Sequence, residues 1–276
     1  MEDKFTVKER NMLLDSTKPY YFKAAYFGFI VGDTLGVPYK LKENQEPGTW
    51  SGNTSSMLAT MQAIINKNGM AQAGEIKKQL VNFIKHGMYT IDGVVFDTGI
   101  TVTKNIMSHA RKKNESYFVN YSKNSNDNSA IIRMLPIAFL NTTDFKTLSI
   151  AKLTNNHFIS DYCCLEYINI IRHRGKINNL FRDIAELSEE EVKSTNYVMD
   201  TLEAIIWCIT NTDNYKDAVL KAISLGGNTN TLAALVGSIA GCLYGYEDIP
   251  KEWIDNLKML EYLNVMYEEF IKVLYY

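Results

Sequence analysis

Two polar segments carry residue types suited to binding chemistry, and each runs directly into an apolar stretch. They span residues 48–54 and residues 225–231, and both combine glycine with Ser, Thr or Asn. Hydroxyl and amide oxygens can ligate a hard cation such as Mg²⁺, but unlike carboxylates they bring no charge to it. The same residue types cap helices and stabilise turns. The pattern therefore favours helix entries with turn hydrogen bonds over a functional metal site.

Four further polar segments are spread along the chain, at residues 32–40, 96–101, 127–136 and 153–157. They supply carboxylate, ammonium, guanidinium and imidazole groups. Each segment is a weak signal by itself, because Asp, Asn and Thr are also common in ordinary turns. Their order along the chain carries more information than any one of them.

The elements that must position these segments read as helices. Apolar residues recur at helical spacing through most of the chain, for example at Met57, Met61 and Ile64. The best strand-like stretch, at residues 94–96, is very short. We predict an all-α fold, with one multi-helical domain over residues 1–276.

Two of the predicted helices carry a small residue at every fourth position. The two series are Ala24, Gly28, Gly32, Gly36 and Ala233, Gly237, Gly241, Gly245. Residues four apart share one helix face, so each series forms a ridge without side chains. Glycine inside a helix costs about 1 kcal/mol relative to alanine, and close contact with a neighbouring helix would offset that cost. We predict that both ridges are buried packing surfaces rather than ligand sites.

Composition and charge narrow the functional classes. The 276 residues are 46% hydrophobic with a net charge of −2, which gives no basis for holding nucleic acid. The 4 cysteines form no metal-binding or disulfide pattern and read as reduced core thiols. Residues 1–18 lack a signal-peptide core, and the apolar runs at residues 24–32 and 232–246 are shorter than a membrane span requires. We therefore predict a cytoplasmic protein that binds neither nucleic acid nor membrane.

Taken in order, the six polar segments resemble the ADP-ribosylglycohydrolase family over about residues 20–257. The resemblance implies an all-helical fold with a cleft that holds two magnesium ions. It implies an activity that removes ADP-ribose from modified proteins or related acceptors, so ADP-ribose or an ADP-ribosylated protein is the expected partner. It also implies that Gly52, Asn53, Asp97, Asn228 and Asn230 converge on one cleft although they are distant in sequence.

At the metal and catalytic positions implied by this resemblance, the acidic residues are missing. The family-equivalent positions are Lys40, Ser51, Gly52, Asn53, Asn228, Asn230 and Thr231. Family members carry four aspartates and a glutamate where this chain has two kinds of neutral residue and a lysine. Without those charges the attraction for Mg²⁺ falls steeply, and the remaining hydroxyl and amide oxygens are neutral. We expect no metal cofactor to remain, and water without a metal is a poor nucleophile at neutral pH.

The positions that the resemblance assigns to ligand binding are mixed. They are Asp97, Gly99, Asn128, Arg133, His157, Gly226 and Gly227. In the family, glycines in the segment matching residues 127–133 let backbone amides approach the diphosphate of ADP-ribose. Here Asp127 and Ser129 replace those glycines, and a carboxylate facing a diphosphate repels it. For Asp97, a helix cap is an equally good interpretation.

Three interpretations of function remain open. The first is a pseudoenzyme that keeps the ADP-ribosylglycohydrolase fold and binds ADP-ribose, a related nucleotide or a modified protein without cleaving it. The second is an active hydrolase with an altered or single metal site. The third is a structural or interaction protein without a small-molecule ligand, as in lens crystallins that resemble the family. The lost carboxylates favour the first interpretation, whereas Asp127 and Lys40 favour the third.

Overall fold

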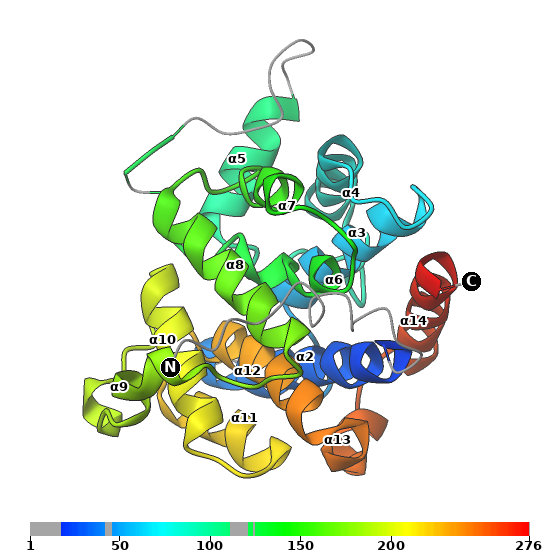
Figure 1. Cartoon of the computed structure of the whole chain (residues 1–276). Helices are drawn as coiled ribbons and strands as arrows, with labels where there is room; N and C mark the ends of the chain where they lie inside the picture. The colour runs from blue at the N-terminus through cyan, green and yellow to red at the C-terminus, as the bar shows by residue number, and fades with distance from the viewer. Residues whose placement is uncertain (1–17, 42–45, 111–120, 124, 276) are drawn as a thin grey trace.

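The computed structural model describes residues 18–41, 46–110, 121–123 and 125–275, and this part of the chain is helical (Figure 1). In chain order the α-helices are α2 (Lys18–Leu41), α3 (Gly52–Ile65), α4 (Ala73–His86), α5 (Ile100–Ala110), α6 (Leu135–Ala138), α7 (Asp144–Ala151), α8 (Phe158–Arg172), α9 (Arg182–Ala185), α10 (Val198–Thr210), α11 (Tyr215–Ser224), α12 (Thr229–Tyr244), α13 (Lys251–Asp255) and α14 (Leu260–Tyr275). The predicted all-α fold is confirmed.

The described residues contain no β-strand, only a single bridge between Asp127 and Tyr197. Residues 94–96, the best strand-like stretch in the sequence, are irregular chain leading towards α5. Three residues of strand propensity cannot form a strand unless a partner strand is present to take their backbone hydrogen bonds.

The centre of the fold is the contact between α2 and α12, which lie side by side and antiparallel (Figure 1). The two glycine ridges pack against each other. A Cβ atom added at Gly28 would lie 2.3 Å from the carbonyl oxygen of Gly237, and one added at Gly237 would lie 2.2 Å from the carbonyl oxygen of Gly28. Both ridges are buried, so the predicted packing role is confirmed for the helical members. Gly245 lies just beyond α12, at a φ of 98°.

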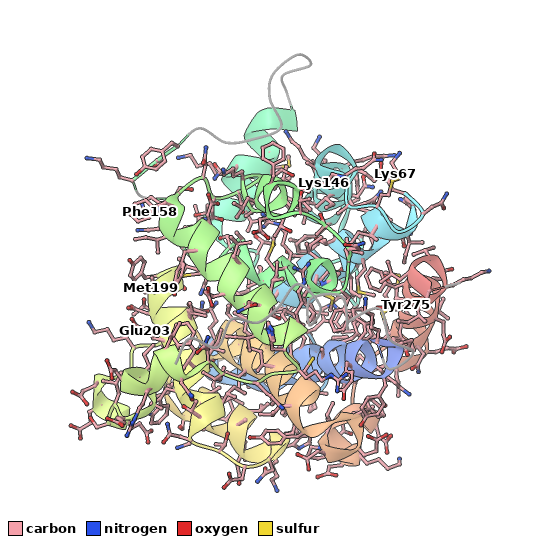
Figure 2. All side chains as sticks on the ribbon, viewed as in Figure 1. Lys67, Lys146, Phe158, Met199, Glu203 and Tyr275 are labelled. Carbon is pink, nitrogen blue, oxygen red and sulfur yellow. The ribbon has the colours of Figure 1, made fainter. Side chains whose placement is uncertain are left out.

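Other helices close around this pair, and their side chains fill the spaces between the ribbons (Figure 2). From α11, the buried Tyr215 hydroxyl donates to the carbonyl oxygen of Gly28 at 2.8 Å. From α14, the ring of Phe270 stacks on Phe22 of α2 with centroids 4.6 Å apart. Tyr167 of α8 is hydrogen-bonded to Ser238 of α12 at 2.7 Å. The α2–α12 pair is therefore held on several sides.

The four cysteines are buried and none forms a disulfide. Burial raises the pKa of Cys163 and of Cys242 to about 12, so these thiols stay protonated and unreactive at neutral pH. No helix in the described ranges has both the length and the apolar character of a membrane span.

Candidate functional site

Asp33, in the C-terminal half of α2, lies at the centre of a buried polar cluster. Its side chain is 0% exposed, and it accepts four hydrogen bonds from Ser51 and Thr54 at the start of α3. Ser51 donates through its Oγ at 2.6 Å and its backbone N–H at 3.0 Å. Thr54 donates through its Oγ1 at 2.7 Å and its backbone N–H at 3.1 Å. The carboxylate therefore satisfies amides that the first turn of α3 leaves without partners, where a negative charge is also favourable.

Two opposing effects act on this carboxyl group. Burial raises the pKa of Asp33, because the charged form loses its hydration. The hydrogen bonds from Ser51 and Thr54 lower it, because they stabilise the carboxylate. Burial is the larger effect, so the pKa of Asp33 lies above its usual value. Because the hydrogen bonds lower the pKa, removing their donors would raise it further.

Two asparagine side chains turn their amide nitrogens towards the carboxylates. Asn53 Nδ2 donates to Thr231 Oγ1 at 3.1 Å and lies 3.3 Å from Asp33 Oδ1. Asn230 Nδ2 donates to Asp97 Oδ2 at 2.8 Å and lies 3.4 Å from Asp33 Oδ1. Both asparagines are buried. The two amides thus link α3 and α12 to Asp33, and the Asn230 amide also links α12 to Asp97 in the segment before α5.

Lys40, in the last turn of α2, contributes the only ammonium group that contacts this cluster within the described residues. Its Nζ lies 3.0 Å from Asp97 Oδ2 and donates to Asn228 Oδ1 at 2.5 Å. Asn228 is the N-cap residue of α12, yet its side chain makes no capping hydrogen bond. Asp97 has a φ of 47°, a conformation uncommon for residues other than glycine. The helix cap suggested for Asp97 is wrong, since its carboxylate pairs with Lys40 and Asn230 instead.

Gly52 lies where the backbone of the 97–98 segment presses on the start of α3. A Cβ atom at this position would be 2.6 Å from the carbonyl oxygen of Asp97 and 2.9 Å from the Cα of Thr98. Real Cβ atoms do not approach so closely, so any side chain at Gly52 would require this segment to move. The backbone occupies the space into which an aspartate at position 52 would extend.

The structure brings together eight of the residues singled out in the sequence. They are Lys40, Ser51, Gly52, Asn53, Asp97, Asn228, Asn230 and Thr231. They come from the C-terminal end of α2, the N-terminal ends of α3 and α12, and the 97–99 segment. Asp33 was part of a segment noted in the sequence, but its position at the centre was missed. Its only signal was a lone carboxylate inside an apolar helix.

A second polar group lies beyond Gly99, around the carboxylate of Asp127. Thr101 Oγ1 donates to Asp127 Oδ2, and the Ser129 backbone N–H donates to Asp127 Oδ1 at 3.0 Å. Asn155 Nδ2 donates to the same Oδ1, also at 3.0 Å. Asp97 belongs to the first polar group and Thr101 to the second, so the two groups lie at opposite ends of the 97–101 segment. Between them, a Cβ atom added at Gly99 would lie 3.8 Å from Ser129 Oγ. The donors of this second group are therefore taken up by the protein's own carboxylate.

Asn128 and Arg133 make structural contacts. Asn128 Nδ2 donates to Thr201 Oγ1 of α10 at 3.0 Å. The Arg133 side chain is 0% exposed and donates to the Ser129 carbonyl oxygen at 2.7 Å and to Thr154 Oγ1 at 2.7 Å. Burial lowers the pKa of Arg133 to about 10, so it remains charged at neutral pH. In this arrangement the guanidinium supports the loop from inside, and direct contact with a ligand would require the loop to open.

The other predicted ligand residues lie at the ends of α8 and α12. His157 is the N-cap of α8 and accepts from the Ile159 backbone N–H through Nδ1 at 3.2 Å. Its ring stacks on Phe158, which projects from the surface (Figure 2), with centroids 4.6 Å apart. Gly226 and Gly227 form the turn into α12 with φ values of 70° and 63°. A Cβ at Gly227 would lie 2.0 Å from the Ser194 carbonyl oxygen, whereas Gly226 faces open space.

The donor set of the Asp33 cluster does not suit a pair of divalent cations. Asn53, Asn230 and Lys40 present N–H groups to the two carboxylates, and N–H groups repel a cation. Within the described ranges, no three His, Cys, Asp or Glu side chains gather as a metal site would require. Asn230 Oδ1 is buried without a hydrogen-bond partner there, but it is one neutral oxygen. The residues present therefore do not fit two Mg²⁺ ions.

Substitution of Asp33 by Asn should destabilise the protein by about 3 kcal/mol. The change keeps the shape of the side chain, but it places an NH₂ group against donors from Ser51 and Thr54 and leaves them without a strong acceptor. Chemical denaturation followed by circular dichroism would measure the loss. Asp213→Asn, at an exposed position, is the matched control and should change stability by less than about 0.5 kcal/mol. Equal effects of the two substitutions would contradict the central role of Asp33.

Comparison with known proteins places this geometry in context. A family model described as ADP-ribosylglycohydrolase matches residues 17–275. The ADP-ribosylarginine hydrolase Tri1 of Serratia proteamaculans is 30% identical to this chain, over 90% of this chain and 78% of that protein. The ADP-ribosyl-[dinitrogen reductase] glycohydrolase of Rhodospirillum rubrum is 25% identical, over 85% of this chain and 89% of that protein. A solved structure titled ADP-ribosylglycohydrolase-related protein complex has a similar fold, with a TM-score of 0.74, 17% identity and coverage of 97% and 99%.

Proposed function

The chain belongs to the ADP-ribosylglycohydrolase family, and from that membership we propose that it binds ADP-ribose, a related nucleotide or an ADP-ribosylated protein without cleaving it. Relatives named as hydrolases of ADP-ribosylarginine and of ADP-ribosylated dinitrogen reductase support the choice of ligand class. The geometry of the Asp33 cluster supports the loss of cleavage.

One observation carries this proposal: the groups facing Asp33 and Asp97 are N–H and O–H donors. Asn230 donates to Asp97, Lys40 forms an ion pair with Asp97, and Ser51 and Thr54 donate to Asp33. The carboxylates that this chain does retain are thus satisfied by the protein. A water molecule in such a site has no Lewis acid to lower its pKa towards neutrality, so it stays a weak nucleophile. Contacts between the protein and the ligand do not require an activated water molecule, so the ligand can bind without being cleaved.

An interaction protein without a small-molecule ligand is the second candidate. It is favoured by the second polar group, in which Thr101, Ser129 and Asn155 all donate to the Asp127 carboxylate. These donors are not free for a phosphate in this arrangement, and the buried Arg133 is turned inwards. Binding of an anionic ligand would therefore have to compete with an internal carboxylate.

Titration calorimetry with ADP-ribose, in Mg²⁺ and in EDTA, separates these readings. The proposal expects binding in both buffers with dissociation constants that agree within about twofold, because no metal couples to the ligand. Binding that requires Mg²⁺ would contradict the proposal and support a hydrolase with an altered metal site. If neither ADP-ribose, a related nucleotide nor an ADP-ribosylated protein bound in either buffer, the result would contradict the proposal in favour of an interaction protein.

A further inference from the structure

We propose that the Lys40 ammonium acts as a built-in cation of this site and fixes the 97–99 segment on the start of α3 without a bound metal. The inference deepens the metal-free site of the proposed function, but it concerns how that site is held together. It therefore stands or falls on structural measurements, whether or not the chain binds ADP-ribose.

The first support is the position of the ammonium. Lys40 Nζ has one oxygen from each of two distant segments, Asp97 Oδ2 at 3.0 Å and Asn228 Oδ1 at 2.5 Å. A carboxylate and an amide oxygen are the kinds of ligand that a hard cation takes. The side chains of Lys40 and Asp97 are 24% and 17% exposed, so the pair is partly shielded from solvent. One ammonium thus links the end of α2, the start of α12 and the segment before α5.

The second support is what Asn228 gives up. Asparagine at an N-cap usually accepts a hydrogen bond from the first turn of its helix, and losing that cap costs about 1 kcal/mol. Asn228 occupies the N-cap of the 16-residue α12, yet its Oδ1 is directed to Lys40. The contact with the ammonium takes the place of the cap, which is expected where that contact contributes more than the cap would.

The third support is the strained segment that the ammonium holds. Asp97 sits at a φ of 47°, and its carbonyl oxygen lies so close to Gly52 that no Cβ could fit between them. A positive φ at a residue other than glycine persists only where the surroundings hold it. The surroundings here are Lys40 and Asn230, both bonded to Asp97 Oδ2.

Charge balance shows what removing Lys40 would create. Asp33 and Asp97 are joined through the amide of Asn230, and Lys40 forms an ion pair with Asp97. Two carboxylates and one ammonium leave a single net negative charge. Without Lys40 the two acids would face each other across a neutral amide, beside the freed Asn228 oxygen. Such a vacancy should accept a small cation from solution.

The test compares Lys40→Ala with Lys152→Ala and Lys40→Arg by hydrogen exchange and thermal unfolding. Lys152 pairs with Asp161 at 3.4 Å with similar exposure, 32% and 20%, but outside this cluster. Lys40→Ala should speed amide exchange in residues 97–103, where the Thr103 N–H donates to the Gly99 carbonyl oxygen at 3.2 Å, by about tenfold or more, since a hydrogen bond to a charged group is lost. Lys152→Ala should leave exchange of that segment unchanged. Lys40→Arg keeps the charge, so its exchange rate and melting temperature should be closer to those of the unaltered protein than to those of Lys40→Ala.

Rescue by an added cation makes the test specific. Propylammonium chloride or MgCl₂ should slow amide exchange in residues 97–103 and raise the melting temperature in Lys40→Ala, but neither should do so in the unaltered protein or in Lys152→Ala. The proposal is overturned if Lys40→Ala exchanges like the unaltered protein, or if neither cation restores it. A saturable rise in melting temperature with MgCl₂ in the unaltered protein would also overturn it, because the site would then be open to metal.

Discussion

Incubated with an ADP-ribosylated protein, the unaltered chain should release ADP-ribose about 1000-fold more slowly than a relative that has an intact metal pair, and EDTA should not change its rate. A metal ion contributes several kcal/mol to such a reaction through its charge and the activated water, and each ~1.4 kcal/mol is a factor of ten. At the positions that the family resemblance assigns to the metal, this chain has Asn53, Asn228 and Asn230, and Lys40 forms an ion pair with Asp97. Release of labelled ADP-ribose in Mg²⁺ and in EDTA measures the rate. Fast, EDTA-sensitive release would contradict the prediction.

The reverse substitutions give the matching test for metal binding. Asn53→Asp, Asn228→Asp and Asn230→Asp together with Lys40→Glu should create measurable Mg²⁺ binding in calorimetry, because carboxylates replace N–H donors around Asp33 and Asp97. The structure alters the simplest form of this experiment. Adding Gly52→Asp should lower stability, since its Cβ would collide with the backbone of Asp97. If adding Gly52→Asp improved Mg²⁺ affinity without a loss of stability, the 97–98 segment would move easily.

Replacement of Gly237 by Leu should unfold the protein or destabilise it by more than the ~1–3 kcal/mol usual for overpacking. The reason is that the clash begins at Cβ, which would lie 2.2 Å from the carbonyl oxygen of Gly28, and a backbone atom cannot rotate away. Gly237→Ala should therefore already be strongly destabilising. Urea denaturation measures both. Lys216→Leu, on the exposed side of α11, is the control for added hydrophobicity and should change stability by less than about 0.5 kcal/mol.

Nearly normal stability of Gly237→Leu would contradict the direct contact of the α2 and α12 backbones. A large loss of stability in Gly237→Leu with no loss in Gly237→Ala would contradict a clash at the Cβ atom. It would place the limiting contact at the distal atoms of the leucine, for example against the Tyr215 hydroxyl, which lies 3.1 Å from the added Cβ.

The spacing of small residues predicted the packing of α2 and α12, because a four-residue repeat on a helix is a geometric property that needs no tertiary information. The sequence could not show that the two ridges pack against each other, since nothing in one helix identifies its partner. The position of Asp33 was missed for the same reason. Its importance comes from the amides and hydroxyls of Ser51 and Thr54, which reach it only after folding.

Residues that the family resemblance linked to a ligand illustrate a second limit. Arg133 and Asp127 have charged side chains that a sequence pattern treats as exposed and available. In the structure Arg133 is 0% exposed and Asp127 accepts bonds from Thr101 and Asn155. Burial and internal pairing of a charge depend on which loops meet, and no local signal in the chain reports that. The convergence of Asn53, Asp97 and Asn230 was predicted only through the family resemblance, because the spacing of these residues in the chain does not indicate that they meet.

The interlocked glycine faces also determine how the molecule can transmit motion. Paired helices often respond to a ligand by sliding, with ridges moving past one another by up to a turn of about 5.4 Å. Here Gly28 contacts Gly237 and Gly32 contacts Ala233 through their backbones, so the two helices fit together in only one register. Lys40 and Asn228 lie at the same end of the α2–α12 pair, and sliding of one helix along the other would separate them. We therefore expect that a conformational change at this end of the molecule would not proceed by sliding of α2 along α12.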